Sequence, residues 1–111
     1  PMTGYQIIFG GRAGQGGGTS AATPLWAATV ALINQDMRKR GLRDVGFANP
    51  ALYWMGENSS HFAVRPFHDV TVGNNLGYDA APGWDFATGW GSMDGVALDA
   101  AWAAYLKGGG A

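Results

Sequence analysis

The spacing of apolar residues predicts a strand and a long helix in the first part of the chain. Tyr5–Phe9 is a short β-branched and aromatic run that ends at Gly10-Gly11, as expected of a strand leading into a turn. After a glycine-rich stretch, apolar residues recur at helical spacing from about Ser20 to Arg40, and Gly41 is the expected stop. The many alanines of this segment predict a central and largely buried helix.

Three further elements are expected beyond this helix. Asn49-Pro50 should open a short helix through Trp54, with asparagine as the cap and proline at the first position. Residues 67–72 have the pattern of a short strand, and Ser92 should cap a last helix that runs through Leu106. Residues 73–91 have the composition of a long loop, whose four aromatic side chains argue for packing and against disorder.

Composition narrows the classes of function. With 111 residues the chain can form one small core, so we expect a single unit over residues 1–111 with a disordered tail over residues 107–111. Seven basic residues nearly balance eight acidic ones, and no apolar run approaches the roughly 20 residues of a membrane span. Neither nucleic acid nor a membrane is therefore an expected partner. The absence of cysteine excludes disulfides and thiol nucleophiles.

Two features suggest that the chain is part of something larger. Only 14% of its residues are charged, against roughly 25% in an average globular domain, which indicates extensive burial against further sequence. The first residues, 1–4, have neither the basic nor the apolar region of a signal peptide. The chain is therefore expected to begin inside a domain.

Ser20 follows a glycine turn at the entrance of the long predicted helix. An exposed hydroxyl at the positive end of a helix suits a nucleophile, because nearby backbone N–H groups can stabilise developing negative charge. For an arbitrary serine before a helix, a simple N-cap is the commoner role. The whole string Gly-Thr-Ser-x-x-x-Pro, ahead of an alanine-rich helix, favours the nucleophile.

A serine nucleophile requires a base that activates it. Both histidines, His61 and His68, follow the serine, whereas the subtilisin order places the histidine first, so a subtilase triad is not contained in this chain. An α/β-hydrolase order could use Asp36 or Asp44 with a later histidine. Its Gly-x-Ser-x-Gly elbow is broken here, because Ala22 takes the place of the last glycine. The histidines are interpreted as a surface residue and a strand-end residue.

Together with the segment around Ser20, further short motifs follow one another along nearly the whole chain. In order they are Gly18–Ala28, Ala31–Gln35, Gly46-Phe47, Asn49–Tyr53, Phe67–Thr71, Gly73–Asn75, Pro82–Asp85 and Thr88-Gly89. This series resembles the C-terminal third of the sedolisin, or serine-carboxyl peptidase, family. The resemblance implies an α/β fold: a partial subtilisin-like domain with a parallel sheet, a central nucleophile-bearing helix and a long calcium-binding loop near the C-terminus.

The same resemblance implies that Ser20 is the catalytic residue of a serine-type endopeptidase acting on peptides or proteins. The family's base is a glutamate supported by an aspartate, and a second aspartate helps to stabilise the oxyanion. A carboxylate base and a protonated oxyanion donor both suit acidic pH. These residues lie upstream of the family's serine, and Glu57, the one glutamate present, does not match the base. We therefore expect activity only together with the upstream remainder of the catalytic domain.

The loop region carries aspartates that could bind a cation. Ca²⁺ takes six to eight oxygen ligands, commonly carboxylates with backbone carbonyls and water. The similar family loop binds one calcium ion. Carried over by position, its ligands are the carboxylates of Asp69 and Asp85 and the carbonyls of Val70, Ala81 and Gly83.

Several alternatives stay open at this point. The usual roles of loop aspartates are to cap turns or to face solvent. Asp79 and Asp94 are further candidate ligands if the register differs. A different class of function is a catalytically inactive, calcium-stabilised binding or structural module derived from the same fold. The family resemblance implies an extracellular location for the protein.

Overall fold

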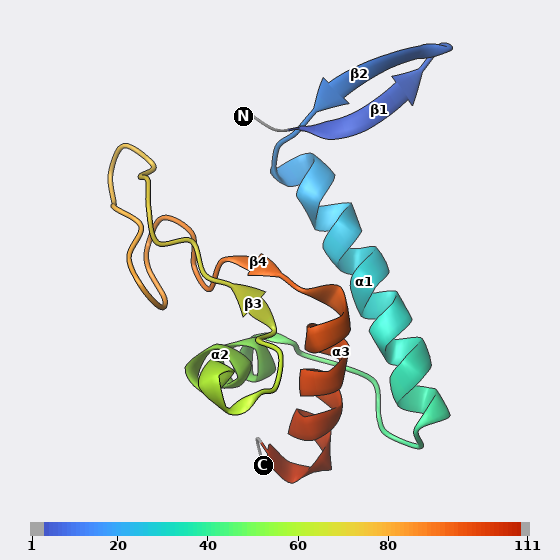
Figure 1. Cartoon of the computed structure of the whole chain (residues 1–111). Helices are drawn as coiled ribbons and strands as arrows, with labels where there is room; N and C mark the ends of the chain where they lie inside the picture. Colours follow the sequence, from blue (N-terminus) through green and yellow to red (C-terminus); the bar gives the residue numbers. More distant parts are fainter. Residues whose placement is uncertain (1–3, 110–111) are drawn as a thin grey trace. The chain divides into compact units, whose positions relative to one another are not determined.

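The computed structural model describes residues 4–109. The chain divides into two compact units, Pro1–Leu32 and Ile33–Ala111, and the division falls inside the long helix α1 (Thr19–Lys39). Figure 1 shows the elements in chain order. No helix within the described range is both long enough and apolar enough to cross a membrane.

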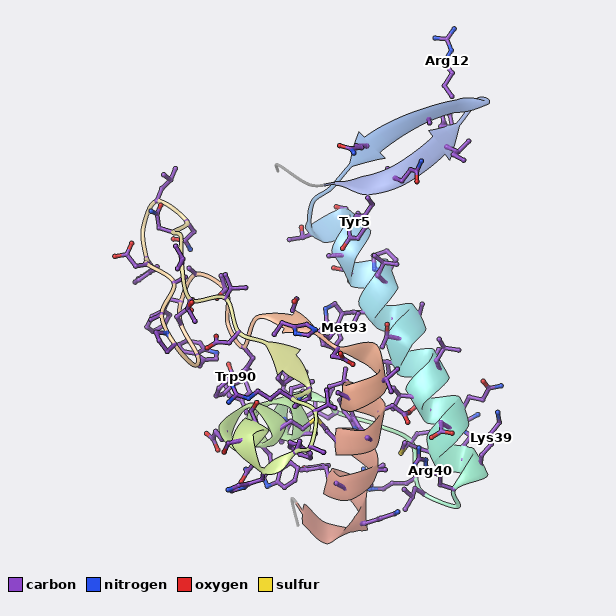
Figure 2. The ribbon with its side chains drawn as sticks, viewed as in Figure 1. Tyr5, Arg12, Lys39, Arg40, Trp90 and Met93 are labelled. Atoms are coloured by element: carbon purple, nitrogen blue, oxygen red, sulfur yellow. The ribbon has the colours of Figure 1, made fainter. Side chains whose placement is uncertain are left out.

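The first unit contains a β-hairpin followed by the greater part of α1. Strands β1 (Tyr5–Phe9) and β2 (Arg12–Gly16) pair antiparallel, with Phe9 opposite Arg12. The connecting Gly10 and Gly11 have φ values of 57° and 74°, which suit a two-residue hairpin turn that residues with a Cβ rarely adopt. Figure 2 shows Arg12 extending from the tip of this hairpin.

The expected parallel sheet is not found among residues 4–109. Both sheets are two-stranded and antiparallel, one formed by β1 and β2, the other by β3 (Phe67–His68) and β4 (Ser92–Met93). Parallel neighbours need a crossover of a dozen or more residues, whereas the Gly10-Gly11 turn sends the chain straight back along β1. The chain is thus mixed α/β, and its described strands form two antiparallel pairs instead of a parallel sheet.

Helix α1 occupies the predicted range almost to the residue, and its end coincides with Gly41 at a φ of 73°. Its predicted burial is not observed: Ile33 and Met37 are its buried residues, whereas Leu25 and Leu32 are exposed. The buried residues of α1 both lie in its last turns, within the second unit.

The second unit packs three helices around one small core. It contains the end of α1, helix α2 (Asn49–Glu57), the 3₁₀ turn η1 (Ser59–His61), helix α3 (Gly95–Ala104) and the final turn η2 (Tyr105–Gly109). Small residues on α3 allow close approach of its neighbours, and α3 contributes the largest buried side chain. The largest fully buried residues are Trp102, Met37, Met55, Leu98 and Pro66.

Helix α2 and the residues before α3 differ from the sequence prediction at their boundaries. Asn49 is the first residue of α2 and not its cap, since the cap position belongs to Ala48, which makes no side-chain capping bond. The strand expected over residues 67–72 is limited to Phe67–His68. Asp94, not Ser92, caps α3, because its Oδ1 accepts from the Ala97 N–H at 2.9 Å while Ser92 is drawn into β4.

Helix α2 also runs three residues further than expected, through Gly56 to Glu57. A glycine inside a helix costs stability, so its presence needs a local reason. The Trp90 ring lies directly on Gly56: a Cβ built there would be 2.2 Å from Trp90 Cδ2. Tyr53 adds an edge contact to the same ring at 6.0 Å between centroids. The glycine therefore allows the end of the long loop to pack on α2.

An ion cluster joins the end of α1 to α3. Arg40, directly after α1, donates from Nε to Asp36 of that helix, and from Nη2 to Asp99 Oδ2 at 3.1 Å. Burial raises the pKa of Asp99 above its ordinary value, and the nearby Asp36 carboxylate raises it further. The hydrogen bond from Arg40 lowers the pKa of Asp36. The charge of Lys39 also lowers the pKa of Asp36.

This cluster predicts a pH dependence of stability. Because the folded-state pKa of Asp99 is raised, the contribution of Asp99 to the free energy of unfolding is fully present below its unfolded-state pKa. This contribution is lost as pH rises through the folded-state pKa. We expect the stability that Asp99 contributes to the wild type to be lost as pH rises from its ordinary pKa of 3.8 through the raised folded-state pKa, and Asp99→Asn to lack this loss. Urea unfolding at a series of pH values from acid to neutral measures the slopes. Asp44→Asn is the control, since Arg38 lowers the pKa of Asp44 and its effect appears only in stronger acid; equal slopes for Asp99→Asn and wild type would contradict the prediction.

Candidate functional site

Ser20 lies in the first turn of α1, in the first unit, and is exposed. Gly18, with a φ of 117°, turns the chain into the helix, and its carbonyl accepts from the N–H groups of Ala21 and Ala22 at 3.0 Å each. The Thr23 hydroxyl bonds back to the Thr19 carbonyl at 2.7 Å. The hydroxyl of Ser20 is therefore presented at the positive end of a long helix, where nearby dipoles favour an oxyanion.

The residues considered as partners of Ser20 all belong to the second unit. Glu57 is the exposed last residue of α2, and His61 is the exposed end of η1. His68 lies in β3, with its Nε2 at 3.7 Å from Asp94 Oδ2. Glu57, His61 and His68 therefore lie on three different elements of the second unit.

Asp85 organises the centre of the long loop. It is only 7% exposed, and it is the one buried charged residue among residues 4–109. Its Oδ1 accepts from the backbone N–H groups of Ala87 (2.8 Å) and Thr88 (2.7 Å), and its Oδ2 accepts from that of Ala81 (3.1 Å). The Thr88 hydroxyl lies 3.1 Å from Oδ1 and 3.0 Å from Oδ2.

These donors fix the charge of the Asp85 side chain. The N–H of Ala81 makes the largest contribution to lowering the pKa of Asp85, followed by that of Thr88, and together they outweigh the opposing effect of burial. The backbone donors therefore favour the ionised carboxylate over the protonated acid. Since the folded-state pKa is lowered, this contribution to stability is present above the unfolded pKa and lost as pH falls through the folded value.

The other predicted calcium ligands lie around the same turn. Asp69 Oδ2 accepts from the Gly83 N–H at 2.7 Å, so Asp69 and Asp85 hold the two ends of the short segment 81–83. The Val70 carbonyl is 3.4 Å from the Thr88 hydroxyl that also contacts Asp85. Hydrogen bonds thus link the five positions named from sequence, with Ala81 and Gly83 joined through their N–H groups and not through the carbonyls that the prediction names.

The residue types at this turn fit a hard cation. Two carboxylates and loop carbonyls are the oxygens that Ca²⁺ prefers. No three histidine, aspartate or glutamate side chains gather anywhere in residues 4–109, so a cation here would rely on backbone carbonyls for most of its shell. Ala81 has no positive φ, whereas Gly83 has a φ of 83°, so alanine at position 81 places no strain on a carbonyl donor.

The two spare candidates have other roles in the structure. Asp94 is the N-cap of α3. Asp79 is exposed and pairs through its backbone with Asn74. Neither has a described contact with Asp69 or Asp85.

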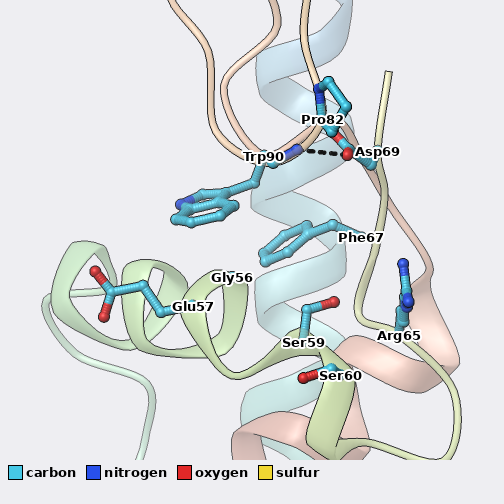
Figure 3. A pocket seen from close by; sticks show the side chains of 10 residues that line it. Gly56, Glu57, Ser59, Ser60, Arg65, Phe67, Asp69, Pro82 and Trp90 are labelled. Carbon is cyan, nitrogen blue, oxygen red and sulfur yellow. Dashed lines mark hydrogen bonds between the residues drawn. The ribbon is translucent and has the colours of Figure 1, made fainter. Parts of the chain in front are cut away.

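A cleft of about 320 Å³ adjoins Asp69 in the second unit. Trp90, Phe67 and Pro82 form its apolar walls, and Arg65 and Ser59 are among its polar residues. Figure 3 shows the Gly83-to-Asp69 hydrogen bond at the edge of this cleft. The cleft connects the candidate cation turn to the end of α2.

Sequence reasoning did not assign a role to Thr88, whose hydroxyl and N–H both contact Asp85. The signal was present, because a serine or threonine three residues after an aspartate is typical of a side-chain-stabilised turn. Asn75 was also not assigned a role, although asparagine is a typical turn residue. Its Oδ1 accepts from the N–H groups of Gly77 and Tyr78 at 3.0 and 2.8 Å.

Comparison with known proteins identifies relatives that match most of the chain. The chain is 43% identical to kumamolisin of Bacillus sp. (strain MN-32) over 104 residues, which cover 88% of this chain and 17% of kumamolisin. It is 41% identical to aorsin of Aspergillus oryzae over 91 residues, 78% of this chain and 13% of aorsin. It is 37% identical to tripeptidyl-peptidase 1 of Bos taurus over 84 residues, 73% of this chain and 15% of that protein.

No family model matches the chain. The chain spans less than a fifth of the length of these curated relatives. The sequence motifs, the mixed α/β structure and the relatives all indicate the same family. Over most of its length the chain is homologous to the serine-carboxyl peptidases of the sedolisin family, and it corresponds to a small part of them.

Proposed function

We propose that the chain is the nucleophile-bearing and calcium-binding part of a serine-carboxyl endopeptidase that acts at acidic pH. The observation that carries this proposal is the exposed Ser20 hydroxyl at the N-terminus of α1, in a chain homologous to sedolisins. Ser20 attacks the scissile carbonyl of a peptide or protein substrate. A glutamate of the upstream remainder takes the proton, and an aspartate of that remainder donates to the oxyanion. The expected location is extracellular.

The proposed architecture follows from the same relationship. Residues 1–111 belong to one catalytic domain, in which a parallel sheet is completed by strands outside this chain. The exposed apolar side chains of α1, such as Leu25 and Leu32, are consistent with a helix that is covered only in the complete domain.

We also propose that Asp69 and Asp85, with the carbonyls of Val70, Ala81 and Gly83, hold one Ca²⁺ ion. The support is that hydrogen bonds already gather these five positions at one turn. Such an ion would lock the long loop and neutralise the two carboxylates. The lowered pKa of Asp85 favours the charged carboxylate that a cation site needs.

A catalytically inactive calcium-stabilised module is the second candidate. One observation favours it: hydrogen bonds gather the predicted calcium-ligand positions within the second unit alone. The two candidates differ in whether Ser20 reacts once the upstream part is supplied.

A peptide aldehyde tests the proposal, because a reactive serine adds to it as a hemiacetal. The chain is incubated with the aldehyde at acidic pH, alone and after mixing with the segment of kumamolisin that precedes the matched region. We expect no adduct alone and an adduct at Ser20 in the mixture, detected by NMR of an isotopically labelled aldehyde carbon. An adduct at another residue refutes the assignment, and a stable complex without any adduct supports the inactive module.

A further inference from the structure

The loop between β3 and β4 exposes a group of apolar side chains. The rings of Tyr78 and Phe86 lie 5.0 Å apart between centroids, and those of Trp84 and Phe86 lie 4.8 Å apart. These rings contact one another, yet Tyr78 is 57% and Phe86 69% exposed, and the nearby Leu76 is 99% exposed. We call Leu76, Tyr78, Trp84 and Phe86 the loop patch.

Polar groups beneath the loop patch hold its shape. The Asn75 side chain accepts from the N–H groups of Gly77 and Tyr78 and donates to the Phe86 carbonyl at 3.4 Å. The Ala80 N–H donates to the Gly73 carbonyl at 2.8 Å. The apolar side chains of the patch are therefore not needed as a core for this loop, and they are presented in a fixed arrangement.

Leu76 is the most informative member of the patch. Its φ of 71° makes it the one non-glycine residue with a positive φ in residues 4–109. Glycine or asparagine adopts this conformation at little cost, whereas leucine is strained there. A strained and fully exposed leucine contributes nothing to the stability of its own loop. Such strain tends to occur where a side chain has a function outside its own fold.

We propose that the loop patch docks into an apolar hollow on the upstream remainder of the same peptidase domain. This inference rests on the proposed function. The chain covers only 17% of kumamolisin, so most of the surface that could cover the patch belongs to the remainder. The charged residues within the span of the patch, 76–86, are Asp79 and Asp85, and Asp85 is only 7% exposed, which matches an apolar partner surface and not a nucleic acid or an acidic peptide.

A second copy of this chain is the alternative occupant. Its cleft beside Asp69 fits the patch poorly, because that cleft is lined in part by Glu57, Arg65 and two serines, and an uncharged patch there would desolvate these groups without compensation. Its exposed apolar side chains, such as Leu32 and Phe47, form no described cleft, so they offer a surface and not a hollow. The upstream remainder is therefore the occupant that the chemistry favours.

Leu76→Gly tests the docking. It removes the exposed side chain and relieves the strain, so we expect an unchanged or raised melting temperature together with at least about tenfold weaker binding to the kumamolisin segment that precedes the matched region. Isothermal titration calorimetry measures the binding. Leu76→Asn, which tolerates the same φ, should weaken binding similarly and shows that added backbone freedom is not the cause. Val96→Ser, at an 85% exposed position on α3 outside the patch, should bind as the wild type does.

Three outcomes overturn the inference. In the first, the complex forms with Ser20-dependent activity but Leu76→Gly binds as tightly as wild type; the docking surface is then wrong while the proposed function stands. In the second, sedimentation of the chain alone shows a dimer that Leu76→Gly abolishes, and the occupant is a second copy. In the third, the wild type does not bind the segment, and the proposed function fails together with the docking.

Discussion

Replacing Ser20 by alanine is expected to abolish peptide hydrolysis by the complex of this chain with the upstream segment of kumamolisin, lowering kcat by about a thousandfold or more. The loss should be large because the hydroxyl is the atom that forms the bond to the substrate, and no neighbour on α1 can replace it: Thr23 bonds to the Thr19 carbonyl, and Thr19 itself is the first residue of the helix. Hydrolysis of a fluorogenic peptide at acidic pH measures the effect.

Ser60→Ala is the matched control, since Ser60 is an exposed serine on η1 to which no catalytic role is assigned. It should leave kcat unchanged. Ser20 is exposed, so its replacement should not alter folding, and circular dichroism of both variants checks this. If Ser20→Ala retained the wild-type rate, the nucleophile would lie elsewhere and the peptidase proposal for this residue would fail.

Calcium is expected to raise the melting temperature of the chain. An ion that binds only the folded state, at a free concentration of a hundred times its Kd, adds about 2.7 kcal/mol to the free energy of unfolding. Asp69→Asn should remove this increment, because it weakens one of the two charged ligands while the amide oxygen can still accept from the Gly83 N–H. Differential scanning calorimetry with calcium and with a chelator measures the shift.

Asp79→Asn serves as the control, since Asp79 is an exposed loop aspartate that has no described contact with Asp69 or Asp85. Its melting temperature should rise with calcium as in the wild type. Asp85→Asn is less specific, because Asp85 also bonds the backbone of Ala81, Ala87 and Thr88 without any ion. An unchanged melting temperature of the wild type at saturating calcium would contradict the site.

Elements with strong local signals were predictable. The range of α1 follows from its apolar period and from Gly41, whose positive φ closes the helix. Strand β2 was missed because the sequence Arg12–Gly16 has no alternating apolar residues. Its pairing depends instead on the Gly10-Gly11 turn, whose chemistry favours a hairpin whatever strand follows. Here the turn was a better guide than the hydrophobic pattern.

The capping of α3 shows where local reasoning ends. Ser92 and Asp94 are both good cap residues, and sequence alone does not choose between them. The tertiary structure decides which residue caps the helix. Ser92 pairs with His68 in the second small sheet, and this leaves Asp94 at the start of α3. In the same way, the resemblance named Asp69 and Asp85, but the hydrogen bonds that join them through residues 81–83 required the fold.

The contact between Gly56 and Trp90 also constrains how this protein can change. The indole covers the helix backbone so closely that any side chain at position 56 would displace it, and a smaller residue at position 90 would leave a void above α2. Substitutions at the two positions should therefore be strongly non-additive. The Trp90 Nε1 is buried without a hydrogen-bond partner among the described residues, so the ring is held by its shape. Positions 56 and 90 can consequently change only together.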